Sequence, residues 1–179
     1  MHRTAVEYSC RTMSSLVTDT TLEEIALAAG RTLRQKGLML AVAESCTGGW
    51  IAQAITSIEG SSGWFERGFV TYTNISKREM LGVSATTLAR QGAVSEATVR
   101  AMAEGALAHS HADVALAVTG IAGPGGGSAE RPVGTVWIAW AGKHRDTIAS
   151  RYSFTGERAQ VRRQSVVAAL AGMIDFLGA

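Results

Sequence analysis

The sequence predicts an α/β fold, a three-layer α/β/α sandwich built around a mixed, mostly parallel sheet. Two compact apolar runs, 38–43 and 114–118, have the length and composition of buried strands. Stretches with helical spacing of apolar residues lie between the strand-like runs, and this alternation is typical of parallel strands with helices on both faces. Two late strand-like runs joined by Gly142-Lys143 predict one antiparallel hairpin.

In the first half of the chain, Thr20 and Glu23 have the spacing of a capping box, which predicts a helix that ends at Gly37. The elements expected next are a strand over 38–43, a helix over 47–57, a Gly/Ser turn over 60–63, a strand over 69–73 and a helix over 74–81.

In the second half, Ser84 and Ser95 are the expected N-caps of two helices. The elements predicted there are helices over 85–91 and 96–109, strands over 114–118, 133–141 and 147–154, and a last helix over 157–177.

Composition sets limits on the class of protein. The chain has 179 residues, 46% hydrophobic and 18% charged, which predicts a globular domain over 19–179, preceded by a flexible extension over 1–18. A net charge of +2 is too small to indicate a nucleic-acid or membrane partner. Two cysteines and the lack of a secretory pattern or long apolar run lead us to expect a cytoplasmic protein without disulfides.

Ser45 and Cys46 lie side by side where the first apolar strand gives way to a helix. A helix N-terminus offers free N–H groups, so a hydroxyl or thiol placed there can attack a substrate beside donors for the developing negative charge. Two alternatives remain at this point: Ser45 is only a helix cap, or Cys46, intrinsically the better nucleophile, reacts instead.

A glycine-rich run, 119–127, follows the second apolar strand. It lacks the lysine of a Walker A loop and the third glycine of the G-x-G-x-x-G spacing. Ser45 likewise lacks the glycines of an α/β-hydrolase elbow and begins no Ser-x-x-Lys motif. Common nucleotide-binding and hydrolase motifs are therefore excluded.

Several longer motifs occur together in one order, and they carry a resemblance to a family: AESCTGG (43–49), GSS (60–62), VTYTNISK (70–77), LGV (81–83), GAVSE (92–96), TGIAGPGGG (119–127) and PVGTV (132–136). By these motifs the chain, from about residue 21 to 171, closely resembles the CinA C-terminal domain family, the nicotinamide-nucleotide amidases. It departs from the family at Glu59, where proline is frequent, and at Arg67, where glycine is common.

The resemblance implies an enzyme that hydrolyses the carboxamide of nicotinamide mononucleotide to nicotinic acid mononucleotide and ammonia, with no metal or cofactor. It implies that Ser45 is the nucleophile and that Tyr72 and Lys77 assist it. It also places Thr119 in the site, although this residue could simply close the glycine turn. A C-terminal arginine contributes, and we favour Arg158 over Arg162.

This chemistry makes demands that residues near the motifs could meet. To act as a base, Lys77 must be neutral, which requires lowering its pKa from roughly 10.4 toward about 7–8 by burial or nearby positive charge. The amides of 46–49, including those of Thr47 and Gly48, are the candidate donors to the oxyanion. Glu44 either supports the site from behind or binds a substrate hydroxyl, and the phosphate would meet Arg158 or the amides of 123–127, beginning with Gly123.

Two other functions compete with this one. The domain could be a non-catalytic nucleotide- or partner-binding module, since in the family it also occurs fused to larger competence- and damage-related proteins, or it could be an amidase of another carboxamide. The combination of Ser45, Tyr72 and Lys77 favours chemistry over recognition. Alanine-rich helices and the resemblance together lead us to expect a homo-oligomer.

Overall fold

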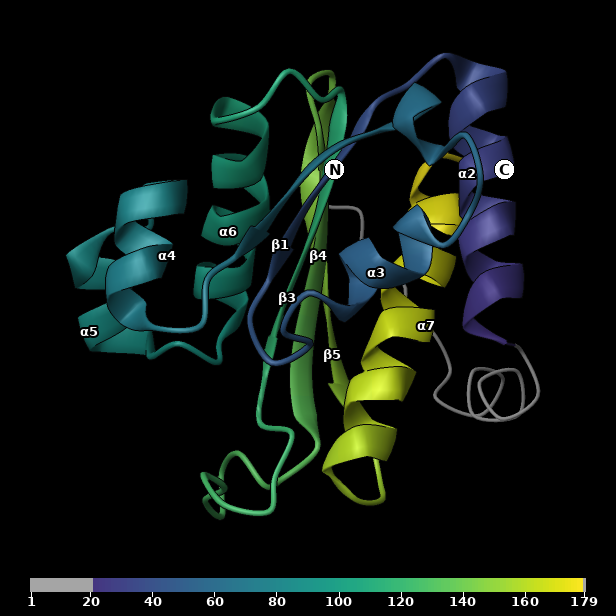
Figure 1. Ribbon diagram of the computed structural model, residues 1–179. Coiled ribbons are helices and arrows are strands. Elements are labelled where there is room, and N and C mark those ends of the chain that lie inside the picture. The colour runs from purple at the N-terminus through teal and green to yellow at the C-terminus, as the bar shows by residue number, and fades with distance from the viewer. Residues whose placement is uncertain (1–20, 179) are drawn as a thin grey trace, which may run out of the picture.

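The structure is a computed structural model that describes residues 21–178. A five-stranded sheet with the order β2-β1-β3-β4-β5 runs through the centre of the described residues (Figure 1). β2, β1 and β3 are parallel, while β4 and β5 are antiparallel to their neighbours, so the expected mixed sheet is confirmed. The strands are β1 (Leu40–Glu44), β2 (Phe65–Val70), β3 (Val114–Gly120), β4 (Thr135–Gly142) and β5 (Arg145–Ser153).

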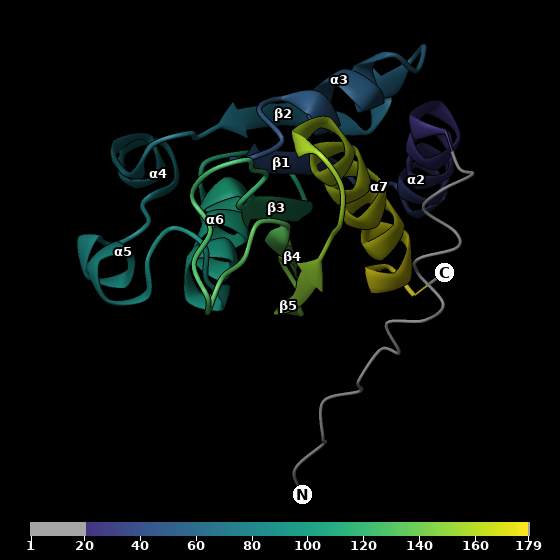
Figure 2. The same cartoon turned by 90° about the horizontal axis from the view of Figure 1, so that it is seen from below.

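Helices cover both faces of the sheet, which Figure 2 shows along a second direction. One face carries α2 (Leu22–Lys36), α3 (Trp50–Thr56) and α7 (Arg158–Phe176). The other face is covered by α6 (Glu96–Ala108), and α4 (Asn74–Leu81) and α5 (Ala85–Gln91) pack beside α6 on that side of the sheet. A single 3-10 turn, η1 (Ser61–Gly63), precedes β2. The three-layer α/β/α sandwich is therefore the observed architecture.

Two hydrophobic cores follow from this layering, because successive side chains of a strand point to opposite faces. In β1, Leu40 and Val42 pack against the α2/α7 layer, and Ala41 and Ala43 pack against the α6 layer. Every residue of β1 is buried, as a central strand covered on both faces requires.

The structure corrects several predicted boundaries. The first capping box is formed by Thr21 and Glu24, one residue later than predicted, because the helix begins at Leu22 and the same Thr-x-x-Glu spacing occurs twice in succession. The strand expected over 69–73 is β2, which ends at Val70, so that Thr71 and Tyr72 lie in the loop before α4.

The other elements lie close to their predicted ranges. The helices predicted over 74–81 and 85–91 agree with α4 and α5, and Ser84 and Ser95 cap their helices as expected. The predicted extension over 1–18 lies outside the described residues. Within residues 21–178, no helix is long and apolar enough to cross a membrane.

The topology brings the two motif-bearing loops together. β1 and β3 are adjacent and parallel, with Glu44 paired to Val118, so the residues after both strands leave the sheet at the same edge. Ligand sites of open α/β sheets typically lie outside the carboxyl ends of the strands.

Candidate active site

Ser45 is the first residue after β1, and its amide donates to the Val118 carbonyl of β3 at 3.0 Å. This bond continues the parallel ladder by one residue and fixes the backbone of Ser45 against the neighbouring strand. The side chain is buried, with 8% of the residue exposed. Ser45 therefore leaves the sheet in a defined direction.

Lys77 lies in α4, and its side chain extends from this helix to Ser45 at the end of β1. Its Nζ lies 3.0 Å from Ser45 Oγ and donates to the Thr71 carbonyl at 2.7 Å. The Thr73 capping box starts α4, which orients the helix that carries the lysine. Lys77 is 1% exposed, and burial lowers its pKa to about 8. The pairing of a hydroxyl with a base that is readily neutralised is the arrangement that nucleophilic catalysis needs.

Cys46 is buried beside Ser45 and is in a poor environment for reaction. Burial raises the pKa of its thiol to about 12, so the thiolate is scarce at neutral pH. Its side chain packs into the core that α2, α3 and α7 form with the sheet. The alternative that Cys46 is the nucleophile is therefore disfavoured.

Glu44 ends β1 and is fully buried. Its carboxylate accepts backbone N–H bonds from Gly49, Ile51 and Ala52 at 2.9–3.0 Å, so it caps α3. A carboxylate at a helix N-terminus also interacts favourably with the helix dipole. Glu44 therefore supports the loop from behind, which is one of its two predicted roles, and its contact with a substrate hydroxyl stays a prediction.

Thr47 and Gly48 form the turn between Ser45 and α3. The Gly48 amide donates to the Ser45 carbonyl at 3.0 Å, and Thr47 is fully buried, with its Oγ1 unpartnered among the described residues. Neither residue lines the cavity next to Ser45. Both residues shape the turn, and their predicted roles toward the substrate stay predictions.

A cavity of about 230 Å³ opens beside Ser45 and Lys77. Its wall includes three further residues predicted for the site, Tyr72, Thr119 and Arg158. Arg158 Nη2 donates to Tyr72 Oη at 2.7 Å, and its Nη1 donates to the Gly123 carbonyl at 2.8 Å. Arg158 therefore joins the β2–α4 loop to the glycine-rich loop at the cavity.

The structure separates the two candidate arginines. Arg162, one turn further along α7, is not part of the cavity wall; it donates to the carbonyls of Cys46 and Thr47 at 3.1 and 2.7 Å. Tyr72 lines the cavity and its hydroxyl accepts from Arg158, while no bond to Lys77 or Ser45 is recorded for it in the described part of the chain; its assistance to Ser45 stays a prediction. Thr119 is oriented by its hydroxyl, which donates to the Ala93 carbonyl at 2.8 Å.

Sequence reasoning missed the α5–α6 loop, which contributes Ala93 and Val94 to the cavity wall. The GAVSE motif was the available signal, but its residues carry no reactive group. It also missed the Thr71 carbonyl, since no side-chain pattern reveals the role of a backbone oxygen.

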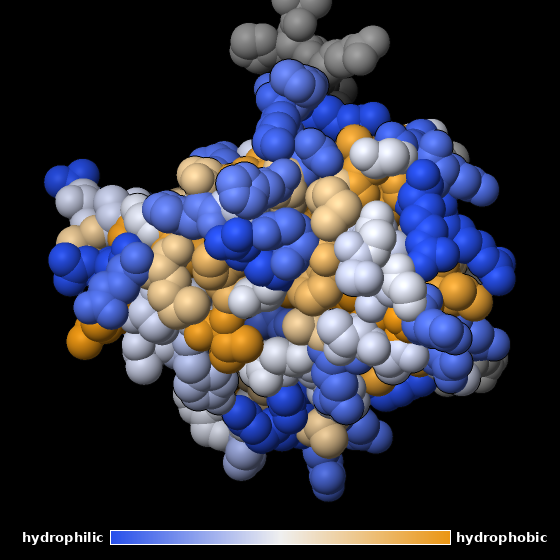
Figure 3. Space-filling model, turned by 45° about the horizontal axis from the view of Figure 1, so that its top comes forward, coloured by the Kyte–Doolittle hydropathy of each residue, from blue (hydrophilic) through white to orange (hydrophobic). Residues whose placement is uncertain are grey.

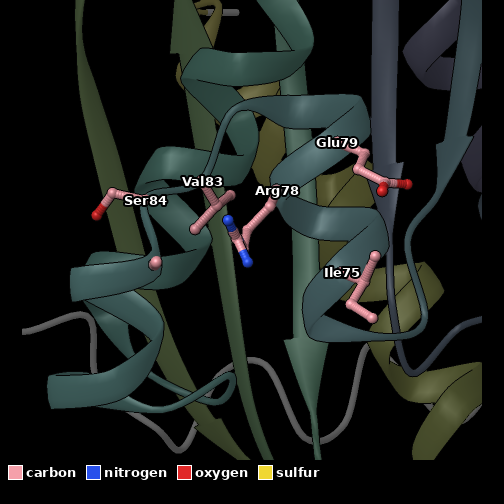
Figure 4. Close-up of a pocket in the computed structure, with 6 residues that line it drawn as sticks. Ile75, Arg78, Glu79, Val83 and Ser84 are labelled. Atoms are coloured by element: carbon pink, nitrogen blue, oxygen red, sulfur yellow. The ribbon is translucent and has the colours of Figure 1, made fainter.

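A second, larger cavity of about 370 Å³ lies between α4 and α5 (Figure 4). Ile75, Arg78 and Glu79 line it from α4, and Val83, Ser84 and Ala85 from the following turn. It contains no nucleophile paired with a base, so the smaller cavity is the better candidate.

Figure 3 shows apolar residues in small separate patches among hydrophilic ones on the face that it presents.

The comparisons with known proteins agree with this geometry. A family model described as the CinA C-terminal domain matches residues 22–177. The chain belongs to the CinA C-terminal domain family.

Within residues 21–178, no group of three or more His, Cys, Asp or Glu side chains is placed to hold a metal ion.

Members of this family similar to the chain include proteins named nicotinamide-nucleotide amidohydrolase PncC. The protein from Enterobacter agglomerans is 54% identical over 149 residues, covering 83% of this chain and 91% of the relative. The protein from Escherichia coli K12 is 52% identical over 154 residues, covering 86% and 93%. Among solved structures, the competence/damage inducible protein CihA from Agrobacterium tumefaciens has a TM-score of 0.85 at 48% identity, covering 88% of this chain and 96% of the other.

Proposed function

We propose that this chain is an amidohydrolase of nicotinamide mononucleotide, with Ser45 as nucleophile and Lys77 as base. The observation that carries the proposal is the 3.0 Å separation of Lys77 Nζ and Ser45 Oγ in a buried site. The names of relatives at 50–54% identity supply the substrate. The same pair would also serve an amidase of another carboxamide, which the experiment below separates.

The reaction begins with Ser45. Its Oγ attacks the carboxamide carbon while neutral Lys77 takes the hydroxyl proton, giving a tetrahedral intermediate with a negatively charged oxygen. Lys77 then returns the proton to the departing nitrogen, so the C–N bond breaks and ammonia leaves an ester on Ser45. Water activated by Lys77 hydrolyses this ester and releases nicotinic acid mononucleotide. The Thr71 carbonyl holds Nζ in place throughout.

The oxyanion needs a donor, and the turn leaves few amides free. Gly48 donates to the Ser45 carbonyl, and Gly49 donates to Glu44. Within residues 21–178, the Cys46 amide has no recorded hydrogen bond to another residue. Because it directly follows the nucleophile, it is the donor that we assign to the oxyanion; one such donor contributes about 3–4 kcal/mol.

Arg158 is the group that we assign to the substrate phosphate. Among residues 21–178 it is the one arginine in the cavity wall, and a guanidinium pairs well with phosphate oxygens. Its bonds to Tyr72 and to the Gly123 carbonyl hold it at the cavity before substrate arrives. The expected cytoplasmic location and homo-oligomeric state stay predictions.

The test is ammonia release from nicotinamide mononucleotide by the purified protein and by Ser45→Ala. We expect turnover by the parent and a loss of more than about 1000-fold in the folded variant. Free nicotinamide and nicotinamide riboside serve as competing carboxamides. Faster turnover of either one would contradict the substrate assignment, and equal activity of Ser45→Ala would contradict the nucleophile.

A further inference from the structure

Arg162 makes an unusual set of contacts for a residue outside the cavity wall. Its Nε donates to the Cys46 carbonyl at 3.1 Å and its Nη2 to the Thr47 carbonyl at 2.7 Å. Its guanidinium carbon also lies 5.1 Å from the centre of the Trp50 ring, a distance at which cation–π attraction operates. One side chain of α7 thus holds two successive peptide groups of the turn that follows Ser45.

The turn itself has little intrinsic preference for its conformation. Gly48 and Gly49 have φ values of 61° and 93°, and glycine can leave such conformations at low cost. Glu44 restrains the amides of Gly49 and of the first residues of α3, but it makes no recorded bond to the peptide groups that follow Cys46 and Thr47. Arg162 bonds the carbonyls of both groups, and the Trp50 amide adds a further bond to the Thr47 carbonyl at 3.2 Å.

The direction of the Cys46 amide depends on this turn. The carbonyl and N–H of a trans peptide group point in opposite directions. Since the Ser45 carbonyl is turned into the loop to accept from Gly48, the Cys46 N–H points out of it. A large rotation of the next two peptide groups would move the Gly48 amide away from the Ser45 carbonyl and remove the bond that orients the Cys46 amide.

We propose that Arg162 is a positioning residue, which holds the carbonyls of Cys46 and Thr47 so that the Cys46 amide stays aligned to stabilise an oxyanion formed at Ser45. It acts on the transition state without touching the substrate. The oxyanion role rests on the proposed function, but the inference applies to attack by Ser45 on any electrophile.

The chain provides a matched control in Arg145, the first residue of β5, which contacts the C-terminal end of α7. Its guanidinium donates to the carbonyls of Phe176 and Leu177 and lies 5.5 Å from the centre of the Phe176 ring. Arg145 therefore also holds two successive carbonyls and contacts an aromatic ring. It is not part of the cavity wall.

The experiment compares Arg162→Met, Arg162→Lys and Arg145→Met with the parent. The kcat and KM for nicotinamide mononucleotide are measured together with the rate at which a fluorophosphonate labels Ser45, followed by intact mass with Ser45→Ala as the blank. We expect Arg162→Met to lose about 100-fold in kcat, with KM within about threefold, and to label at a similarly reduced rate. Arg162→Lys recovers part of this loss, since it retains one carbonyl contact, and Arg145→Met stays within about twofold of the parent.

Three results would overturn the inference: equal losses in the two methionine variants, a change confined to KM, or unchanged labelling in Arg162→Met. A change confined to KM would make Arg162 a substrate ligand instead. If the parent releases no ammonia from the mononucleotide while labelling still falls in Arg162→Met alone, the proposed function fails and the role of Arg162 stands.

Discussion

Lys77 is held in an environment that suits its free base better than its cation. The described structure gives its Nζ two oxygen partners, the Ser45 hydroxyl and the Thr71 carbonyl, and no carboxylate. Burial is the largest cause of its lowered pKa, and the nearby Cys46 thiol opposes the shift only in part. Burial, more than a specific charge, therefore suits Lys77 to its proposed role as the base for Ser45.

This environment predicts the pH profile of the reaction. Because Lys77 must be neutral to accept the Ser45 proton, we expect kcat/KM to rise with pH and to level off above an apparent pKa of about 8. At pH 7 only about a tenth of the lysine is in the active form. The measurement is initial-rate ammonia release between pH 6 and 9.5; a flat profile over that range would exclude Lys77 as the base.

Replacing Cys46 by alanine should leave chemistry intact. Its thiol has a pKa of about 12 and packs in the core, so it supplies bulk to the turn without supplying a thiolate. We expect kcat within about threefold of the parent and a small loss in the free energy of unfolding, of about 1 kcal/mol. The check combines steady-state kinetics with urea unfolding, and a loss of activity as large as that of Ser45→Ala would revive the thiol as nucleophile.

At the scale of the elements, α4 connects Lys77, the proposed base, to the rest of the molecule. Its last residue, Leu81, packs closely against α6 at Gly105. A Cβ built on Gly105 would lie 2.0 Å from the Leu81 carbonyl oxygen, a backbone atom that can yield only if α4 moves. The glycine in the middle of α6 therefore serves the close approach of two helices.

The corresponding prediction is that Gly105→Ala both destabilises the protein and slows it. Overpacking typically costs about 1–3 kcal/mol, partly offset here by the higher helix propensity of alanine. A shift of α4 moves Lys77 away from Ser45, so we expect kcat to fall by between about 10- and 100-fold. Urea unfolding and kinetics measure the two effects.

Gly63→Ala provides the control for this substitution. No atom lies within 4 Å of a Cβ built there, and we expect a change in unfolding free energy of less than about 0.5 kcal/mol with unchanged kcat. Full activity in a destabilised Gly105→Ala variant would show that α4 tolerates the shift.

Local signals explain which elements could be predicted. The helices α4 and α5 begin at threonine or serine caps and α4 ends at Gly82, so their bounds follow from short-range chemistry. The prediction for β2 was wrong because β2 is an edge strand whose first four residues are half-buried or exposed and include the charged Glu66 and Arg67, while Phe69 is its one buried residue. The apolar run at 69–70 was therefore a misleading guide to its start.

The site shows a similar division. Ser45 and Lys77 were assigned through motifs, and the structure brings them to hydrogen-bonding distance although 32 positions separate them. The capping role of Glu44 and the carbonyl contacts of Arg162 depend on where α3 and α7 pack, and no local pattern encodes that. Glu44 and Arg162 bond backbone groups of the turn, and a charged side chain near a motif is easily interpreted from sequence as a substrate ligand instead.

At the scale of the whole molecule, the active site has a cost in folding stability. An unfolded chain binds a proton at Lys77 up to about pH 10.5, whereas the folded protein holds it only up to about pH 8. Between these values the unfolded state binds more protons, so this lysine makes the free energy of unfolding rise with pH. Below pH 8 the full penalty applies, on the order of 3 kcal/mol.

Lys77→Met removes this penalty together with the base, which makes stability and activity diverge. We expect no measurable turnover by the variant, and a difference in unfolding free energy, variant minus parent, that is most favourable to the variant below pH 8. As pH rises from 8 to 10.5 this difference should decline by roughly 3 kcal/mol, because the parent alone is relieved of burying a charge. Taking the difference cancels the other titrating groups, Tyr152 included, which both proteins share. Urea unfolding at intervals between pH 7 and 10.5 measures this difference. Parallel curves for the two proteins would mean that Lys77 keeps its ordinary pKa on folding. Lys77 would then be protonated at neutral pH and could not act as the base.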